Sequence, residues 1–185
     1  MKKTTILYVM ALLCLNFLAN AQTVTISLPK IGEKLPNAFW EQEHDFYVNG
    51  TLKRQNLNAF RGKLLIIDFF ATWCSTCINK LKYMEKLQKG NKSEYNFLLL
   101  SAKNTGDTPE KIDALQQKLK LNVLRSTVIN DSTMNKLFPH RTVPTYVWIS
   151  ENGVFQGITG SAMLNQANIN QLKTKKVAVS KTSGR

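Results

Sequence analysis

The sequence is poor in cysteine and histidine, because its 185 residues include three cysteines and two histidines. A small protein held together by disulfides needs more cysteines, so we exclude a disulfide scaffold. A second possible role for these residues is a zinc site, with Cys74, Cys77, His44 and His140 as the four ligands. Structural zinc ligands usually occur as local pairs, and neither histidine has such a partner nearby in the chain, so we expect no metal.

Acidic residues are also scarce, because 12 aspartates and glutamates face 25 lysines and arginines, for a formal net charge of +13. Such an excess is common in proteins that bind nucleic acid. Here the basic residues are spread along the chain, and we expect them to favour solubility and attraction to acidic partners or membrane surfaces, with no nucleic acid bound. A basic stretch ends the chain, and we expect residues 174–185 to form a disordered tail.

Apolar runs of more than about ten residues are missing as well, apart from one near the N-terminus. Positions 6–19 are apolar except for Asn16, two lysines precede them, and Ala19-Asn20-Ala21 ends the run. This pattern predicts a secretion signal over residues 1–21 that is cleaved after Ala21. The run is shorter than the roughly 18–20 residues that span a bilayer, and an uncleaved anchor is the alternative. We therefore expect a mature protein of the periplasm or cell envelope that retains Cys74 and Cys77.

The hydrophobic pattern predicts one α/β domain over residues 45–173, preceded by a lead-in segment over residues 22–44 that contains a short strand near Val24–Leu28. The dipeptides Asn49-Gly50 and Asn152-Gly153 predict two β-hairpins, at 46–52 and 145–159. Further strands are expected at 64–70, 97–100 and 123–128. Helices are expected at 75–89, from 108 to 119, from a cap at Asp131 or Ser132 to 138, and at 165–173, with a helical turn at 57–60.

Two cysteines, Cys74 and Cys77, lie where a long apolar run changes to a helical pattern. Leu64–Phe70 is typical of a strand buried on both faces, and a helix is expected from Ser75. The N–H groups and partial positive charge of a helix N-terminus stabilise a thiolate at Cys74. A thiolate attacks disulfides, and a second thiol one turn later can resolve the mixed disulfide. We expect an exposed sulfur at Cys74 and a shielded one at Cys77.

Asp68 interrupts the apolar run that precedes the cysteines. Burial disfavours the charged form of a carboxyl group, so we expect a raised pKa, in the range where the group exchanges protons. An aspartate at a strand edge, hydrogen-bonded to backbone, is the alternative.

Together these features resemble the thioredoxin superfamily, and in particular its exported TlpA/ResA-like branch of thiol-disulfide oxidoreductases. The resemblance covers roughly Leu57–Lys173. It rests on the segment Trp73-Cys74-Ser75-Thr76-Cys77, on Asp68 six residues before the first cysteine, and on Thr142-Val143-Pro144-Thr145 before a later strand. It implies an α/β thioredoxin fold, with a central mixed β-sheet flanked by helices, an inserted αβ unit between Asp107 and Val128, and an N-terminal β-hairpin extension.

The resemblance implies that Cys74 attacks the client disulfide, that Cys77 resolves the mixed disulfide, and that Asp68 is the general base for Cys77. No cofactor is implied beyond the redox-active Cys74–Cys77 pair. Relatives in this branch mostly reduce disulfides of envelope proteins, for example during cytochrome c maturation. They receive their electrons from a membrane carrier of the DsbD/CcdA kind.

The resemblance also implies a substrate groove beside the cysteines. Pro144 is implied to follow a cis peptide bond, which leaves the backbone of Val143 free to pair with an extended substrate. Trp73 and Thr142 are implied to line the same groove.

Ser75-Thr76 stands between the cysteines where thioredoxins have glycine and proline. These two residues help to set cysteine acidity and redox potential, so the choice between reduction and exchange of disulfides stays open. Three other readings are a non-catalytic module that binds peptides, a peroxiredoxin-like peroxide reductase, and a permanent structural clip. Thr72-Trp73-Cys74 fits the peroxidase pattern poorly, and closing so small a ring would stabilise the fold only weakly.

Overall fold

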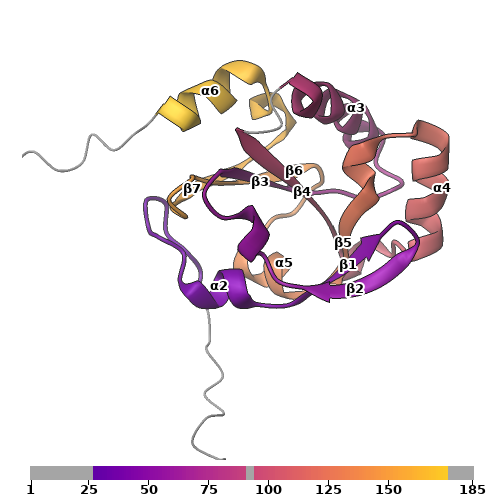
Figure 1. The fold of residues 1–185 in the computed structure, drawn as a ribbon, viewed down its shortest axis with the longest axis horizontal. Coiled ribbons are helices and arrows are strands. Elements are labelled where there is room, and N and C mark those ends of the chain that lie inside the picture. Colours follow the sequence, from indigo (N-terminus) through magenta and orange to yellow (C-terminus); the bar gives the residue numbers. More distant parts are fainter. Residues whose placement is uncertain (1–26, 91–93, 175–185) are drawn as a thin grey trace, which may run out of the picture.

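The computed structural model describes residues 27–90 and 94–174 (Figure 1). The expected signal peptide over residues 1–21, most of the expected strand at Val24–Leu28, and residues 175–185 of the expected tail lie outside the described residues. Among the residues that are described, no helix is long and apolar enough to cross a membrane.

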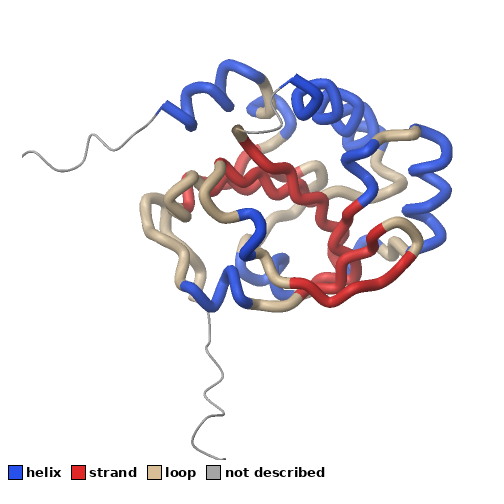
Figure 2. The backbone as a smooth tube through the Cα atoms, viewed as in Figure 1, coloured by secondary structure: helices blue, strands red, loops and turns tan. Residues whose placement is uncertain are grey.

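A mixed β-sheet of seven strands forms the centre of the molecule, with strand order β2-β1-β5-β4-β3-β6-β7 (Figures 1 and 2). β4 and β5 run parallel to the central strand β3, and β1, β2, β6 and β7 are antiparallel to their neighbours. The strands are β1 (His44–Val48), β2 (Thr51–Gln55), β3 (Leu64–Phe69), β4 (Tyr95–Ala102), β5 (Ser126–Asp131), β6 (Thr145–Ile149) and β7 (Phe155–Thr159).

Every residue of β3 is buried, which agrees with the continuous apolar run at this place in the sequence. A strand with neighbours on both edges and helices on both faces needs apolar side chains in both directions. β3 ends immediately before the cysteine segment, so the most deeply buried strand of the sheet supports the site.

One face of the sheet is covered by α3 (Ser75–Gly90), α4 (Pro109–Leu119) and α6 (Gln166–Thr174) (Figure 1). The spacing of three and four residues in α3 brings Leu81, Met84 and Leu87 onto the buried side, as the sequence predicts. They pack in one hydrophobic cluster with Ile66 of β3 and Trp148 of β6. This cluster also holds both cysteines of the site.

The opposite face is covered by the short helices α2 (Asn37–Glu41) and α5 (Thr133–Leu137) and by the 3-10 turn η1 (Asn58–Phe60). Phe39 and Trp40 of α2 pack in a second cluster with Phe138 and Phe155. Three further 3-10 turns connect the elements: η2 (Lys103–Thr105), η3 (Asn122–Arg125) and η4 (Ser161–Met163).

Both predicted hairpins are confirmed, because β1 pairs with β2 and β6 pairs with β7 in antiparallel register. In the first hairpin Asn49 and Gly50 both have positive φ, 48° and 85°. This is the conformation that makes Asn-Gly the preferred dipeptide of a two-residue turn. The first hairpin also pairs with β5, which makes the N-terminal extension part of the sheet.

The bounds of two expected strands need correction, one helix was missed, and the helix cap expected at Asp131 or Ser132 is confirmed at Asp131. The strand expected at 123–128 is β5 (Ser126–Asp131), because Val123 and Leu124 are buried from within η3 instead. The strand expected at 97–100 is the longer β4, and α2 was not expected at all. The helix start near residue 132 is capped by Asp131, whose Oδ1 accepts a hydrogen bond from the Met134 N–H at 2.7 Å, whereas Ser132 makes no capping bond.

Candidate active site

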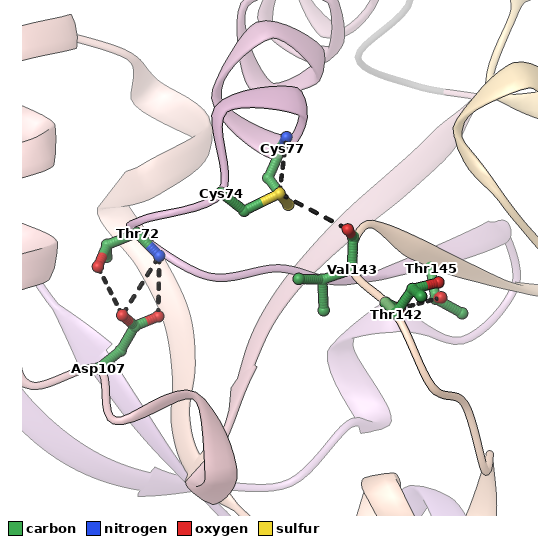
Figure 3. Close-up of a disulfide and its surroundings, with 7 residues drawn as sticks. All are labelled: Thr72, Cys74, Cys77, Asp107, Thr142, Val143 and Thr145. Carbon is green, nitrogen blue, oxygen red and sulfur yellow. Dashed lines mark hydrogen bonds between the residues drawn. A yellow bond between two sulfur atoms is a disulfide. The ribbon is translucent and has the colours of Figure 1, made fainter.

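Cys74 and Cys77 form a disulfide at the N-terminus of α3, with their Cα atoms 5.2 Å apart (Figure 3). Cys74 lies just before the first residue of the helix, and Cys77 lies in its first turn. The Cys77 backbone N–H donates a hydrogen bond to Cys74 Sγ over 3.1 Å. In the reduced protein such a donor stabilises negative charge on this sulfur, in addition to the positive end of the helix dipole.

The two sulfurs differ in accessibility. Cys74 is 8% exposed and Cys77 is 0% exposed. The order is the one that the sequence indicates, but the sulfur expected to be exposed at Cys74 is mostly covered. Of the two cysteines only Cys74 has solvent-exposed surface, so it is the residue that an incoming disulfide can approach.

Val143 and Pro144 lie beside the disulfide, in the loop before β6. The Val143–Pro144 peptide bond is cis, as the resemblance implies. Cys74 Sγ lies 3.6 Å from the carbonyl oxygen of Val143 (Figure 3). The Thr145 hydroxyl donates a 2.6 Å hydrogen bond to the carbonyl oxygen of Thr142. This bond joins the residues on either side of Val143 and Pro144 and so fixes the loop. The loop and the helix start therefore meet at the reactive sulfur.

A groove of about 410 Å³ opens between this loop and the segment after β4. Trp73, Thr142 and Val143 line it, so three of the predicted substrate-binding residues share one concave surface. Pro144 is buried directly behind Val143. Trp73 is 65% exposed, and its Nε1 donates a 2.9 Å hydrogen bond to the carbonyl oxygen of Thr105, which holds the indole at the groove's edge.

His140 and Arg141 add basic character to the same groove. The His140 ring lies 4.2 Å from the ring of Phe69, centroid to centroid, and its Nδ1 is 3.0 Å from the carbonyl oxygen of Phe138. Arg141 is exposed. Among the described residues that line the groove none is acidic.

Asp68 is completely buried in β3, on the face of the sheet that α3 covers. Its backbone register places it opposite Leu99 and Tyr146, which both belong to the cluster that contains Cys77. Burial raises the pKa of the Asp68 carboxyl well above its ordinary value. Neither carboxyl oxygen has a hydrogen-bond partner in the described part of the protein, so a strand-edge aspartate bonded to backbone does not describe it.

The sequence reasoning missed one group at the site, Asp107. Its carboxylate accepts hydrogen bonds from the Thr72 N–H at 3.0 and 3.2 Å and from the Thr72 hydroxyl at 2.5 Å (Figure 3). It also accepts one from the Ser101 hydroxyl at 2.7 Å. Asp107 thereby ties the segment before Cys74 to the end of β4 and to the start of α4. Its place before Thr108-Pro109 indicated only a helix start.

The two histidines do not join the cysteines. His44 is buried at the start of β1, and its Nδ1 lies 2.9 Å from Asp131 Oδ2. Across residues 27–90 and 94–174, no three or more histidine, cysteine, aspartate or glutamate side chains are grouped as metal ligands would be.

Comparison with known proteins agrees with this geometry. The chain is 24% identical over 106 residues to the thioredoxin-like protein YneN of Bacillus subtilis, an alignment that covers 57% of this chain and 61% of YneN. It therefore spans less than two thirds of the length of this curated relative.

Two solved structures illustrate the shared fold. DsbF of Mycobacterium tuberculosis, described in mixed oxidized and reduced forms, superimposes with a TM-score of 0.59 at 14% identity, over 73% of this chain and 97% of DsbF. The exposed lipoprotein thioredoxin Etrx1 of Streptococcus pneumoniae superimposes with a TM-score of 0.54 at 20% identity, over 70% of this chain and 96% of Etrx1. Residues 30–179 match the Redoxin family. The chain belongs to the Redoxin family, within the thioredoxin superfamily, and has a TlpA/ResA-like thioredoxin fold.

Proposed function

We propose that this protein is an exported thiol-disulfide oxidoreductase that cycles Cys74 and Cys77 between dithiol and disulfide. The observation that carries the proposal is the disulfide at the start of α3, with Cys74 Sγ 3.6 Å from the carbonyl oxygen of Val143, a residue that lines the groove. A permanent clip would need neither the groove nor the difference in exposure between the two sulfurs.

The reduction of a client proceeds in two exchange steps. The Cys74 thiolate attacks one sulfur of the client disulfide, a Cys74–client disulfide forms, and the other client sulfur leaves as a thiolate that takes a proton from solvent. Cys77 then passes its proton to Asp68 and attacks Cys74 Sγ. The Cys74–Cys77 disulfide forms, and the second client thiolate is released. Two electrons have moved from the cysteine pair to the client, and the reverse sequence oxidises a client dithiol.

Asp68 suits the second step as a general base, because its raised pKa brings a carboxyl towards the acidity of a thiol. Trp73, Thr142 and Val143 form the client-binding wall, and the cis bond before the buried Pro144 shapes its backbone. A client segment laid in extended form along Val143 would bring its disulfide to Cys74.

Export and partners are further parts of the proposal. The pattern of residues 1–21 supports a secretion signal. Etrx1, which shares the fold, is an exposed lipoprotein, and this supports an envelope location here. A membrane dithiol carrier of the DsbD/CcdA kind would return electrons to the pair. Apocytochromes c awaiting haem attachment are one candidate client, and other disulfide-containing envelope proteins are the alternative.

Insulin reduction by dithiothreitol tests the activity. The wild-type protein should accelerate precipitation of the insulin B chain, and Cys74→Ser should abolish the acceleration. A Cys74→Ser variant that accelerates as well as wild type would contradict the proposal. An inactive wild type that still binds extended peptides in the groove would support the peptide-binding module instead.

Trapping with Cys77→Ser identifies the clients, because this variant stops at the mixed disulfide. Recovery of apocytochromes c would place the protein in haem maturation, and recovery of many envelope proteins would indicate general disulfide repair. Cys74→Ser/Cys77→Ser is the matched control, since it keeps the groove but can form no mixed disulfide.

A further inference from the structure

Four strands place one residue each in a row across the face of the sheet whose hydrophobic cluster contains Cys77. Asp68 of β3 pairs in register with Leu99 of β4 on one side and with Tyr146 of β6 on the other. Tyr146 in turn pairs with Thr159 of β7. Residues directly opposite one another in a sheet project from the same face. The row therefore sets a carboxyl group beside a phenol on the face that α3 covers.

Asp68 and Tyr146 share an unusual situation within the described part of the chain. Both are 0% exposed, and neither the two carboxyl oxygens nor the phenol oxygen has a hydrogen-bond partner. Buried polar atoms without partners are rare in folded proteins, and they often mark groups that act in function. A phenylalanine in place of Tyr146 would fill the same space without that cost.

Burial is the cause of the raised pKa of the Asp68 carboxyl, and no charged side chain of the described residues contributes to it. Leu99 is apolar, and the hydroxyl of Thr159 accepts a hydrogen bond from Trp148 Nε1 at 2.8 Å. From α3, Cys77 lies in the same cluster and the half-buried Tyr83 packs against it. Glu85 of α3 is also buried, and its carboxylate accepts hydrogen bonds from Asn122 Nδ2 and from the Val123 N–H. Burial and the nearby Asp68 both raise the pKa of the Tyr146 hydroxyl, so this phenol stays protonated and remains a donor.

We propose that Tyr146 is a positioning residue for Asp68. The Tyr146 hydroxyl donates a hydrogen bond, directly or through one water molecule, to the carboxylate form of Asp68. This inference rests on the proposed function, in which Asp68 accepts the proton of Cys77. The structure describes the disulfide state, in which Cys77 has no proton to give and a neutral Asp68 needs no donor.

In the reduced protein Asp68 must first lose its own proton, and Tyr146 stabilises the resulting carboxylate. The Cys77 proton then moves to Asp68, the Cys77 thiolate forms the bond to Cys74 Sγ, and the client thiolate leaves. The proton on Tyr146 stays in place throughout. The Tyr146 hydroxyl therefore sets the pH at which Asp68 becomes a carboxylate that can accept the Cys77 proton. It forms and breaks no covalent bond itself.

The second exchange step can be observed alone with dithiobis-nitrobenzoate. Cys74 of the reduced protein releases one coloured thiolate as it forms a mixed disulfide, and the attack of Cys77 on Cys74 Sγ releases the second. The rate of the second release is measured against pH for wild type, Tyr146→Phe, Asp68→Asn and the double variant. Tyr83→Phe, which removes a half-buried tyrosine hydroxyl of α3 outside this row, is the matched control.

Tyr146→Phe should move the midpoint of this pH profile upward by about one unit, a tenfold change in the equilibrium between acid and carboxylate. Tyr83→Phe should leave the profile unchanged. In an Asp68→Asn background Tyr146→Phe should have no further effect. A Tyr146→Phe profile that superimposes on wild type, or the same shift in the Asp68→Asn background, would overturn the inference.

The outcomes separate this inference from the proposed function. A wild type that shows no second release fails the proposed function, whereas two normal releases with an unshifted Tyr146→Phe profile fail only the role of Tyr146. A second measurement needs no variant of Tyr146. The carbon resonance of the Tyr146 ring next to the oxygen should change with pH at the midpoint of Asp68 in the reduced wild type, and should not change in Asp68→Asn. A resonance that ignores pH in both proteins would overturn the role of Tyr146.

Discussion

Asp107 is expected to hold the segment before Cys74 in place, and its replacement by asparagine tests this. The carboxylate accepts hydrogen bonds from the N–H and hydroxyl of Thr72 and from the hydroxyl of Ser101. An asparagine of nearly the same size loses the charge and turns an N–H₂ group towards one of these donors.

The magnitude follows from these contacts. Hydrogen bonds to a charged group contribute roughly 1.5–3 kcal/mol each, and the group is half-buried, so solvent takes over part of the loss. We expect Asp107→Asn to lower the free energy of unfolding by about 2 kcal/mol. Urea denaturation of the oxidised protein measures it. Glu151→Gln, at an exposed turn position, is the charge-matched control and should lie within about 0.5 kcal/mol of wild type.

Asp107→Asn should reduce the activity of the site more than it reduces the stability of the fold. Since Thr72 stands two residues before Cys74, release of this segment should lower the rate of insulin reduction several-fold at a temperature where the variant is still folded. A double-mutant cycle with Thr72→Val isolates the contact between the two side chains. If Asp107→Asn is as stable and as active as Glu151→Gln, the segment is held by other contacts and the reasoning is refuted.

Three further predictions concern charged groups. Burial alone would raise the pKa of Glu85, but hydrogen bonds from Asn122 and Val123, together with Lys89, lower it on balance. Ionised Glu85 therefore stabilises the fold above its ordinary pKa of ~4.3, and urea titrations should show the advantage over Glu85→Gln disappear as the pH falls through the lower folded-state pKa. The pH dependence of stability that comes from Asp68 has the opposite sign to that from Glu85. The pKa of Asp68 is raised in the folded state, so the free energy of unfolding falls as the pH rises above the pKa of an aspartate in the unfolded chain. Asp68→Asn should thus be more stable than wild type near neutral pH and equally stable at about pH 3, while its second exchange step slows. Arg141→Glu should raise the KM for peptides with an acidic residue beside the cysteine, and Lys118→Glu on the exposed side of α4 should not; equal KM values would argue against a basic groove.

The parts of the fold that the sequence predicts are those decided by local chemistry. Asn49-Gly50 predicts its hairpin because few other residues adopt two successive positive φ angles. The apolar spacing of α3 likewise needs only the helical period. The strand expected at 123–128 fails for the opposite reason. Val123 and Leu124 are as apolar as strand residues, but they lie in η3. There the Val123 N–H donates a hydrogen bond to the Glu85 carboxylate instead of to a neighbouring strand.

The residues of the candidate site also fall into two groups, those that a short motif predicts and those that only the fold brings to the site. Cys74, Cys77 and the cis bond before Pro144 could be predicted from short motifs. Asp107 could not, because the segment that it holds lies 35 residues away and only the fold of the inserted αβ unit brings the two together.

The row of Asp68 and Tyr146 across the sheet shows why such groups matter for redox chemistry in this chain. Ser75-Thr76 separates the cysteines, and residues outside this motif hold the segments around it. The Asp107 hydrogen bonds fix the backbone before Cys74, and the strand register pairs Asp68 with Tyr146 on the face of the sheet whose cluster contains Cys77. Differences in reactivity between this protein and its relatives should therefore follow substitutions at these supporting positions as closely as substitutions between the cysteines.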